Sequence, residues 1–222
     1  MKQYFAFLAL VVLPFFVFSQ TLKTINKPTI KGLDEVAPFS EDLAAVRKGN
    51  QWGFIDKTGQ LVIDFRSDLV WSKNADPKRK DVKGIRYPQF KNGRCMIQEI
   101  KDEDIPYYGF IDTEGQIAIE PEYINLTEFD DGRAVGIFCR RTYRGKNNFQ
   151  LNIYEYTFTE AVLNTEGEII WPIEDREGIL MKKGRYEMPE LRATLISPDL
   201  LAVKDTTNDW EIRNINSQNQ KP

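Results

Sequence analysis

Residues 39–63 decide the fold: they read Phe39-Ser-Glu-Asp-Leu-Ala-Ala-Val46, then the turn-prone Arg47-Lys-Gly-Asn50, then Gln51, then Trp52-Gly-Phe-Ile-Asp-Lys-Thr-Gly-Gln-Leu-Val-Ile63. Short apolar runs separated by turns that contain Gly and Asn are typical of β-hairpins. In Asp56-Lys-Thr-Gly59 an Asp opens a turn and a Gly follows three residues later, where φ is often positive. The stretch therefore predicts about three short antiparallel strands joined by tight turns.

The same pattern recurs along the chain with decreasing fidelity. The part that begins with Phe returns as Phe90–Ile97, Phe129–Gly136 and Ile196–Val203, and the part with the turn returns as Tyr108–Gln116, Glu160–Glu168 and, in worn form, Trp210–Asn214. A unit of a few short strands cannot bury its apolar face alone, so neighbouring units must stack. We expect an all-β protein of antiparallel hairpin repeats, stacked as a propeller-like or solenoid array, with three clear repeats and a degenerate fourth.

The array of repeats can end in two ways, as a closed ring or as an open array. A strand expected at Thr29–Lys31 precedes the first Phe and lacks a preceding hairpin. Pairing this strand with the last hairpin closes a ring and removes exposed strand edges. The alternative is an open array whose atypical terminal repeats act as caps.

Residues 1–19 carry the pattern of a secretory signal peptide. Lys2 is followed by an apolar run from Phe5 to Phe18, and the small Val17 and Ser19 stand where a signal peptidase reads the chain. The run is shorter than the roughly 20 residues of a bilayer-spanning helix. We expect an exported protein, periplasmic, at the cell surface or extracellular, with one β domain over residues 20–215 and a polar tail over residues 216–222.

Composition excludes several classes of function. A formal net charge of −3 with 28% charged residues gives no general attraction to nucleic acid or to an anionic membrane. The chain has no His, which removes the most common metal ligand and every Ser-His or Cys-His arrangement. We therefore expect no catalytic residues, no bound metal and no cofactor.

The two cysteines, Cys95 and Cys139, allow two interpretations. An exported protein can form a disulfide between them. In the repeat alignment, however, Cys95 takes the inward strand position of Ala44 and Ala134, where a free Cys acts as a small buried hydrophobe. The sequence leaves both interpretations open.

Residues 52–63, with the preceding Phe39–Val46, closely resemble the WG-repeat family (WG-containing repeat) of bacterial secreted proteins, which is named for the Trp-Gly pair. The second repeat keeps Gly109-Phe-Ile-Asp-x-x-Gly115 but has Tyr108 in place of the Trp, and the later repeats match less well. The resemblance implies an all-β, propeller-like repeat protein of the envelope or exterior, without a common catalytic activity. The residues themselves indicate that a Gly lets the backbone pack closely while the aromatic ring covers it, so Trp52 is expected to be structural.

Insertions are the candidates for a binding face, because extra residues in a repeat array project as loops. Residues 66–86 are rich in basic side chains, residues 100–106 are acidic, and residues 140–148 combine basic charge with an aromatic ring. Basic and aromatic side chains together suit an anionic glycan, an anionic polymer or an acidic protein. The candidate binding residues are Arg140, Arg141, Tyr143, Arg144 and Lys146, with Trp71, Lys78, Arg79 and Lys80.

We therefore expect an exported, non-catalytic repeat scaffold that binds an envelope or extracellular partner, does not bind nucleic acid, and has no membrane span in the mature chain. One alternative is a carboxylate-dependent glycan hydrolase, which needs two carboxylates about 5–10 Å apart in a groove. Its candidate acids are Asp102, Glu103 and Asp104, or Glu174, Asp175 and Glu177. Another alternative is a protein-interaction subunit of a larger envelope assembly, marked by a contiguous exposed apolar patch.

Overall fold

The computed structural model describes residues 26–216. The predicted signal peptide and residues 217–222 of the predicted tail lie outside the described residues. The chain divides into two units, Met1–Lys31 and Gly32–Pro222, and every named strand belongs to the second. Thr29–Lys31, expected as a strand, is not one, because strand pairing begins at residue 35.

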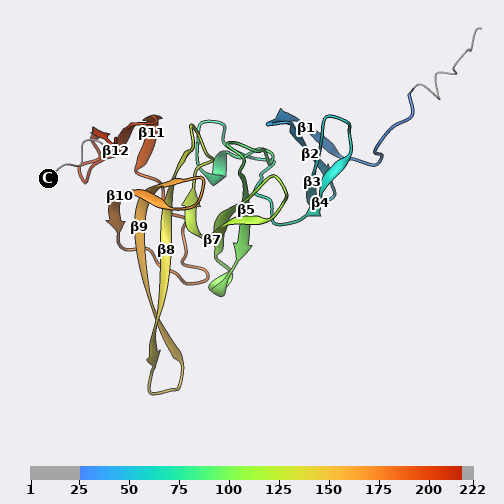
Figure 1. Cartoon of the computed structure of the whole chain (residues 1–222). Coiled ribbons are helices and arrows are strands. Elements are labelled where there is room, and N and C mark those ends of the chain that lie inside the picture. Colours follow the sequence, from blue (N-terminus) through green and yellow to red (C-terminus); the bar gives the residue numbers. More distant parts are fainter. Residues whose placement is uncertain (1–25, 217–222) are drawn as a thin grey trace, which may run out of the picture. The chain divides into compact units, whose positions relative to one another are not determined.

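Antiparallel hairpins build three separate sheets (Figure 1). The first sheet contains β1 (Glu35–Ser40), β2 (Leu43–Lys48), β3 (Gln51–Ile55) and β4 (Leu61–Arg66). The second contains β5 (Cys95–Ile100), β6 (Pro106–Ile111), β7 (Ile117–Leu126), β8 (Arg133–Lys146), β9 (Asn152–Asn164) and β10 (Ile169–Arg176). The third contains β11 (Ala193–Ser197), β12 (Leu200–Lys204) and β13 (Trp210–Asn214). Helical structure in residues 26–216 is limited to the short 3-10 turns η1 (Val82–Gly84) and η2 (Asp102–Asp104).

The sheets correspond to the predicted repeats. The first repeat is β1–β4, and the second and third share one sheet because β7 serves both: Tyr123 pairs with Tyr108 of β6, and Leu126 pairs with Gly136 of β8. The fourth repeat, β11–β13, has three strands. The prediction of an all-β protein of antiparallel hairpin repeats is confirmed. Within the described residues the first and third sheets do not pair with each other, so the ends of the array are not joined by strand pairing.

The second and third repeats each pack their opening Phe against the repeat before them. Phe90 lies edge-on to Phe54 of β3, with ring centroids 4.7 Å apart, and both rings are fully buried. Phe129 lies against Phe110 of β6 at the same distance. An aromatic pair of this kind contributes about 0.5–1.5 kcal/mol beyond the burial of its area. The recurring Phe of the sequence therefore makes the contact between the first and second repeats and between the second and third.

The turns that follow each Phe are joined to one another by hydrogen bonds. The carboxylate of Glu41 accepts hydrogen bonds from the backbone N–H groups of Asn92 and Gly93, at 2.5 and 2.7 Å. The side-chain oxygen of Asn92 accepts from the N–H of Gly132 at 3.1 Å. These bonds tie the first three repeats together at one edge of the array.

The Gly of the Trp-Gly pair is needed because the next strand crosses directly over it. A Cβ atom at Gly109 would lie 2.3 Å from the carbonyl oxygen of Ile119, and one at Gly53 would lie 2.8 Å from that of Ile63. Both distances are shorter than van der Waals contact allows. The neighbouring Trp52 is fully buried, which supports the structural interpretation of this aromatic position.

Cys95 and Cys139 are both buried and unpaired. Cys95 lies in the apolar cluster between the first two repeats, and Cys139 lies in a different cluster, with its Sγ 3.7 Å from the Tyr107 hydroxyl. Burial raises the pKa of the Cys95 thiol. The sequence left open a disulfide or a small buried hydrophobe, and in the structure each Cys is a small buried hydrophobe.

We predict that Gly109→Ala lowers the free energy of unfolding by about 1–3 kcal/mol, because the added methyl group must displace the backbone of β7. Urea unfolding followed by circular dichroism measures the change. Glu120→Ala, at an exposed position of β7, is the control and is expected to change stability by less than about 0.5 kcal/mol. Equal stability of the two variants would contradict the crossing of β7 over Gly109.

We also predict that neither cysteine of the native protein reacts with a thiol reagent, since a buried, protonated thiol is a poor nucleophile. In concentrated guanidinium, without a reductant, both thiols are expected to react. The measurement is the absorbance of the released chromophore. Absence of free thiols in the denatured protein would show that a disulfide had formed instead.

Candidate functional site

The long hairpin of β8 and β9 carries the predicted basic residues. Pairing of β8 with β7 ends at Phe138, and pairing of β9 with β10 ends at Phe158. Residues 140–157 are therefore paired only with each other, and this segment, called the ribbon below, extends beyond the neighbouring strands (Figure 1). Residues 140–146, expected as part of a loop, belong to strand β8.

The turn of the ribbon is shaped by local hydrogen bonds. The Asn147 side-chain oxygen accepts from the N–H groups of Phe149 and Leu151, at 2.9 and 3.0 Å, and Gln150 has a positive φ of 61°. The same arrangement occurs at Asp56, where the carboxylate accepts from the N–H groups two and four residues on. Because these bonds are local, the turn forms without burying its apolar side chains. Phe149 is 83% exposed and Leu151 is 63% exposed.

The cations of the ribbon divide into paired and unpaired ones. Arg141 forms an ion pair with Asp102 and lies over the Tyr154 ring, 3.5 Å from its centroid. Arg144 forms an ion pair with Glu155. Within residues 26–216, neither Arg140 nor Lys146 has an acidic partner within ion-pair distance. Both side chains are exposed.

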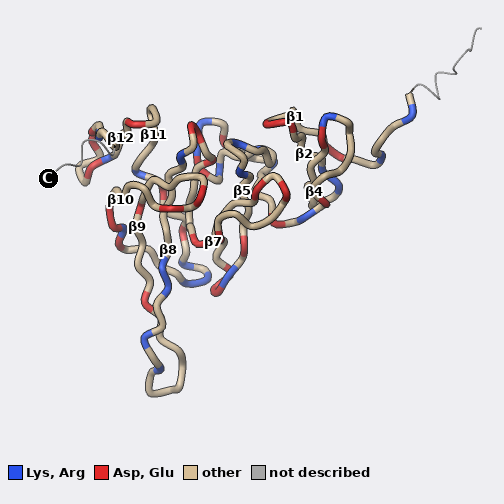
Figure 2. Tube along the Cα trace, viewed as in Figure 1, with Lys and Arg blue, Asp and Glu red and all other residues tan. Residues whose placement is uncertain are grey.

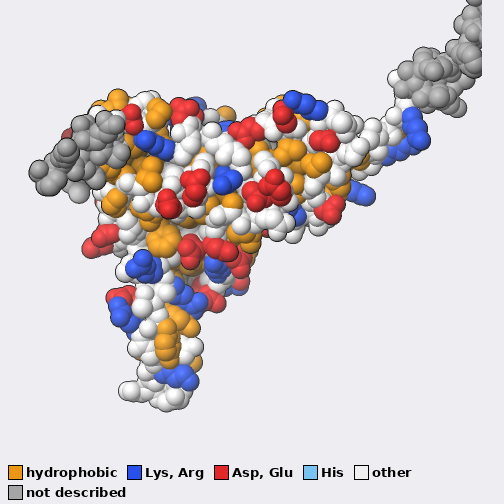
Figure 3. Space-filling model, viewed as in Figure 1, with side chains coloured by type: hydrophobic (Ala, Val, Ile, Leu, Met, Phe, Trp, Pro, Cys, Tyr) orange, Lys and Arg blue, Asp and Glu red, His pale blue; other side chains and the backbone are white. Residues whose placement is uncertain are grey.

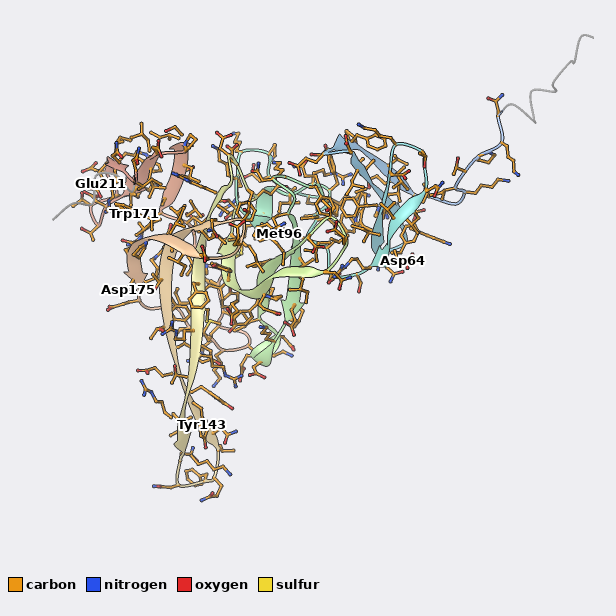
Figure 4. All side chains as sticks on the ribbon, in the orientation of Figure 1. Asp64, Met96, Tyr143, Trp171, Asp175 and Glu211 are labelled. Atoms are coloured by element: carbon orange, nitrogen blue, oxygen red, sulfur yellow. The ribbon has the colours of Figure 1, made fainter. Side chains whose placement is uncertain are left out.

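Basic, acidic and apolar positions are distributed unevenly along the ribbon. Figure 2 shows the Lys and Arg positions along its arms and an uncharged turn at its end. Figure 3 shows apolar side chains beside basic ones on the same segment. The labelled Tyr143 of Figure 4 lies on the ribbon, away from Asp175 on β10. Tyr143 is 54% exposed, and the centroid of its ring lies 5.6 Å from that of Tyr154.

The second predicted group, in residues 66–86, lies elsewhere and is partly structural. Trp71 packs edge-on against Trp52, with ring centroids 5.6 Å apart. Arg79 binds Asp81 and also Glu190, the latter at 2.8 Å. Lys78 and Lys80 are exposed. Arg140 lines one hollow, and Trp71, Lys78, Arg79 and Lys80 line three others; none of these four hollows is lined by members of both groups.

A buried polar network beneath this insertion was missed by sequence reasoning. The fully buried Asn125 donates hydrogen bonds to Asp81, at 3.0 Å, and to the carbonyl oxygen of Pro189, at 2.9 Å. Burial alone raises the pKa of Asp81, but hydrogen bonds from Arg79 and Asn125 outweigh it, and the net pKa lies below the ordinary value. The network fixes the insertion to β7. The local sequence around Asp81 does not predict this network.

A second buried acid, Glu160, stands where the first repeats have Trp52 and Tyr108. Its Oε1 accepts from the backbone N–H groups of Arg192 and Ala193, at 2.7 and 2.8 Å, and its Oε2 pairs with Arg176. Burial raises the pKa of Glu160, and these hydrogen bonds and the Arg176 charge only partly offset it. Glu160 thus anchors the start of the fourth repeat. The sequence signal that could have predicted this buried acid is a Glu at a repeat position that is aromatic in the first two repeats.

Three of the six acids considered for hydrolysis form ion pairs with cations. Asp102 pairs with Arg141, Asp104 pairs with Lys183, and Glu103 accepts from the Lys183 N–H at 2.9 Å. Glu174 pairs with Arg192 at 3.1 Å. The acidic insertion therefore contacts the ribbon through Asp102 and the segment at Lys183 through Glu103 and Asp104.

One open hollow lies where the ribbon leaves its sheet. Its volume is about 710 Å³, and its lining includes Arg140 and Tyr156 of the ribbon together with Asp175 of β10 and Glu177. Asp175 accepts a hydrogen bond from Thr159 at 2.9 Å. Asp175 and Glu177 are both exposed. The hollow therefore offers an unpaired cation, an aromatic ring and two carboxylates to a polar ligand.

Comparison with known proteins supports the repeat assignment. Residues 30–52, 52–72 and 108–135 match the family described as WG containing repeat. A comparison with curated proteins gives no match. Among solved structures, the computationally designed Ika4 protein aligns at 14% identity over 86% of this chain and 95% of its own, with a TM-score of 0.33, a likeness too low to carry an argument. No helix of residues 26–216 has the length and apolar character needed to cross a membrane.

We predict that Asp81→Asn destabilises the protein at neutral pH by about 1–3 kcal/mol, because Arg79 loses its buried partner. The folded-state pKa of Asp81 lies below its ordinary value of 3.8, so its ionic contribution is complete above that value and is lost as the pH falls through the folded pKa. The difference between variant and wild type should therefore shrink in acid.

Urea unfolding at a series of pH values measures this difference. Asp76→Asn, at an exposed position of the same insertion, is the control and is expected to match the wild type. A difference for Asp81→Asn that stays constant down to strongly acidic pH would show that the charge of Asp81 does not stabilise the fold.

Proposed function

We propose that this chain, of which residues 30–72 and 108–135 match the family described as WG containing repeat, is an exported, non-catalytic scaffold that binds an anionic glycan or anionic polymer through its ribbon. Export is proposed from the signal-peptide pattern of residues 1–19. The WG repeats supply the array from which the ribbon extends.

The observation that carries the proposal is the ribbon itself. Between residues 140 and 155 the chain has four cations and one acid, although the whole chain has a net charge of −3. Arg140 and Lys146 are exposed and have no described ion pair, so an anionic ligand can approach them without first displacing an internal carboxylate. Arg140 also lines the hollow at the ribbon base, together with Phe138, which stands two residues before it on the same face of β8. An aromatic face beside a guanidinium group suits a sugar ring that bears a carboxylate, sulfate or phosphate.

The absence of catalysis is proposed from how the acids are used. A general acid needs a carboxyl group whose pKa is raised and which faces the substrate. Glu160 is buried, but both of its oxygens already accept hydrogen bonds from the protein. Asp175 and Glu177, which line the hollow, are exposed. This arrangement favours binding over hydrolysis.

A second candidate function, docking to another protein, is favoured by the end of the ribbon. Phe149, Leu151 and Ile153 are exposed within five residues of each other. Exposed apolar side chains that gather on one segment mark interaction sites more often than single ones do. An experiment on the ribbon must therefore separate its charge from its apolar tip.

We predict that Arg140→Glu with Lys146→Glu weakens binding to immobilised heparin, used as a probe for anionic glycans, by at least about tenfold. Like charges then face the ligand where unpaired cations stood. Elution along a sodium chloride gradient measures the effect, and the variant should elute at lower salt because the interaction is ionic.

Two further variants make the result specific. Lys48→Glu with Lys57→Glu changes the net charge equally but in the first repeat, and it should elute with the wild type. Phe149→Ser with Leu151→Ser keeps the cations and should also elute with the wild type. If the charge variant of the ribbon elutes unchanged, the glycan proposal is wrong; if only the serine variant elutes early, the apolar tip makes the contact and the second candidate is favoured.

A further inference from the structure

The last repeat exposes a face that every earlier repeat covers. By strand pairing, Trp210 and Ile212 of β13 hold the positions of Trp52 and Phe54 of β3: Val203 pairs with Glu211 as Val46 pairs with Gly53, and Ala202 pairs with Ile212 as Ala45 pairs with Phe54. Trp52 and Phe54 are fully buried, in one apolar cluster with Leu69 and Phe90 of the following repeat. Trp210 is 58% exposed and Ile212 is 59% exposed.

The first repeat exposes the opposite face of the same interface. Phe39 corresponds to Phe90 in the repeat alignment, and Val36 corresponds to Leu69, because Val36 pairs with Val46 as Leu69 pairs with Ile97. Leu69 and Phe90 are 2% and 0% exposed, because they cover the β3 side of the first repeat. Val36 is 60% exposed and Phe39 is 52% exposed.

The two exposed faces are therefore the two halves of an interface that the chain already forms internally. Inside the array, Phe90 packs against Phe54 and Phe129 packs against Phe110, each pair at 4.7 Å between ring centroids. Ile212 offers an apolar side chain at the position of Phe54 and Phe110, and Phe39 offers the ring at the position of Phe90 and Phe129. Exposed apolar side chains that gather on one surface mark interaction sites.

We propose that copies of this chain stack end to end, with Phe39 and Val36 of one copy packed against Ile212 and Trp210 of the next. A second copy is the occupant that the structure favours, because its first repeat presents the same kind of surface with which the second and third repeats cover the repeat before them. The faces at the two ends differ, so the contact is heterologous and adds copies in one direction, unlike the self-complementary contact of a two-fold dimer. This inference does not depend on the ligand of the ribbon.

Sedimentation velocity of the purified protein tests the stacking. The protein concentration should run from about 10 µM to about 1 mM, because a contact made by a few apolar side chains on each copy is expected to be weak. The weight-average mass of the wild type should rise with concentration. Phe39→Glu and Ile212→Glu each place a charge in one of the two faces and should raise the dissociation constant at least about tenfold, leaving monomers. Ile100→Glu, at an exposed position of β5, is the control and should associate like the wild type.

The mixture of the two variants makes the test decisive. Phe39→Glu keeps an intact last repeat and Ile212→Glu keeps an intact first repeat, so an equimolar mixture should form a dimer of one copy of each and nothing larger. Formation of that dimer also shows that both variants are folded. A wild type that stays monomeric at every concentration overturns the proposal. So does an association that survives in either variant alone, or a mixture that contains only monomers.

Discussion

In the second and third repeats the opening Phe packs against a strand of the repeat before it, β3 or β6, and this is the contact on which the array depends. Phe90 covers Phe54 and Phe129 covers Phe110, so the interior lies between neighbouring repeats and not within any one of them. A three- or four-stranded sheet has two faces. In this array the apolar side chains of a face are buried only by packing against an adjacent repeat. Stability therefore comes from nearest-neighbour contacts, and the first and last faces are left without one.

Close approach of strands imposes the second constraint. The next strand crosses over Gly53 and Gly109 at distances that exclude a Cβ atom, and the preceding aromatic ring is buried beside the crossing. The Trp52-Gly53 pair is thus buried in the packing of the repeats and is not accessible to a ligand. The ribbon is free of that constraint, because residues 140–157 pair only with each other. Exposed cations and an exposed apolar turn are tolerated there.

Sequence reasoning succeeded where the cause is local. The Asp56 turn is specified within five residues by the carboxylate and by a Gly at positive φ, and a Phe opens each of the first three repeats. It failed where the cause is distant. Arg79, taken as a binding residue, is held by Asp81 and by Glu190, which lies 111 residues away in the chain. Glu160 binds the backbone at residues 192 and 193, and no local pattern specifies that partner.

The sequence by itself determined the all-β class, the hairpin repeats and the segments that interrupt them, because turn chemistry and the apolar period act over short stretches of chain. Only the tertiary structure decided that residues 140–146 extend a strand, that the two basic insertions form no common site, and that Cys95 and Cys139 remain apart. It also decided which faces of the array stay open. These properties depend on which segments lie next to each other after folding, and local sequence patterns do not specify contacts between distant segments.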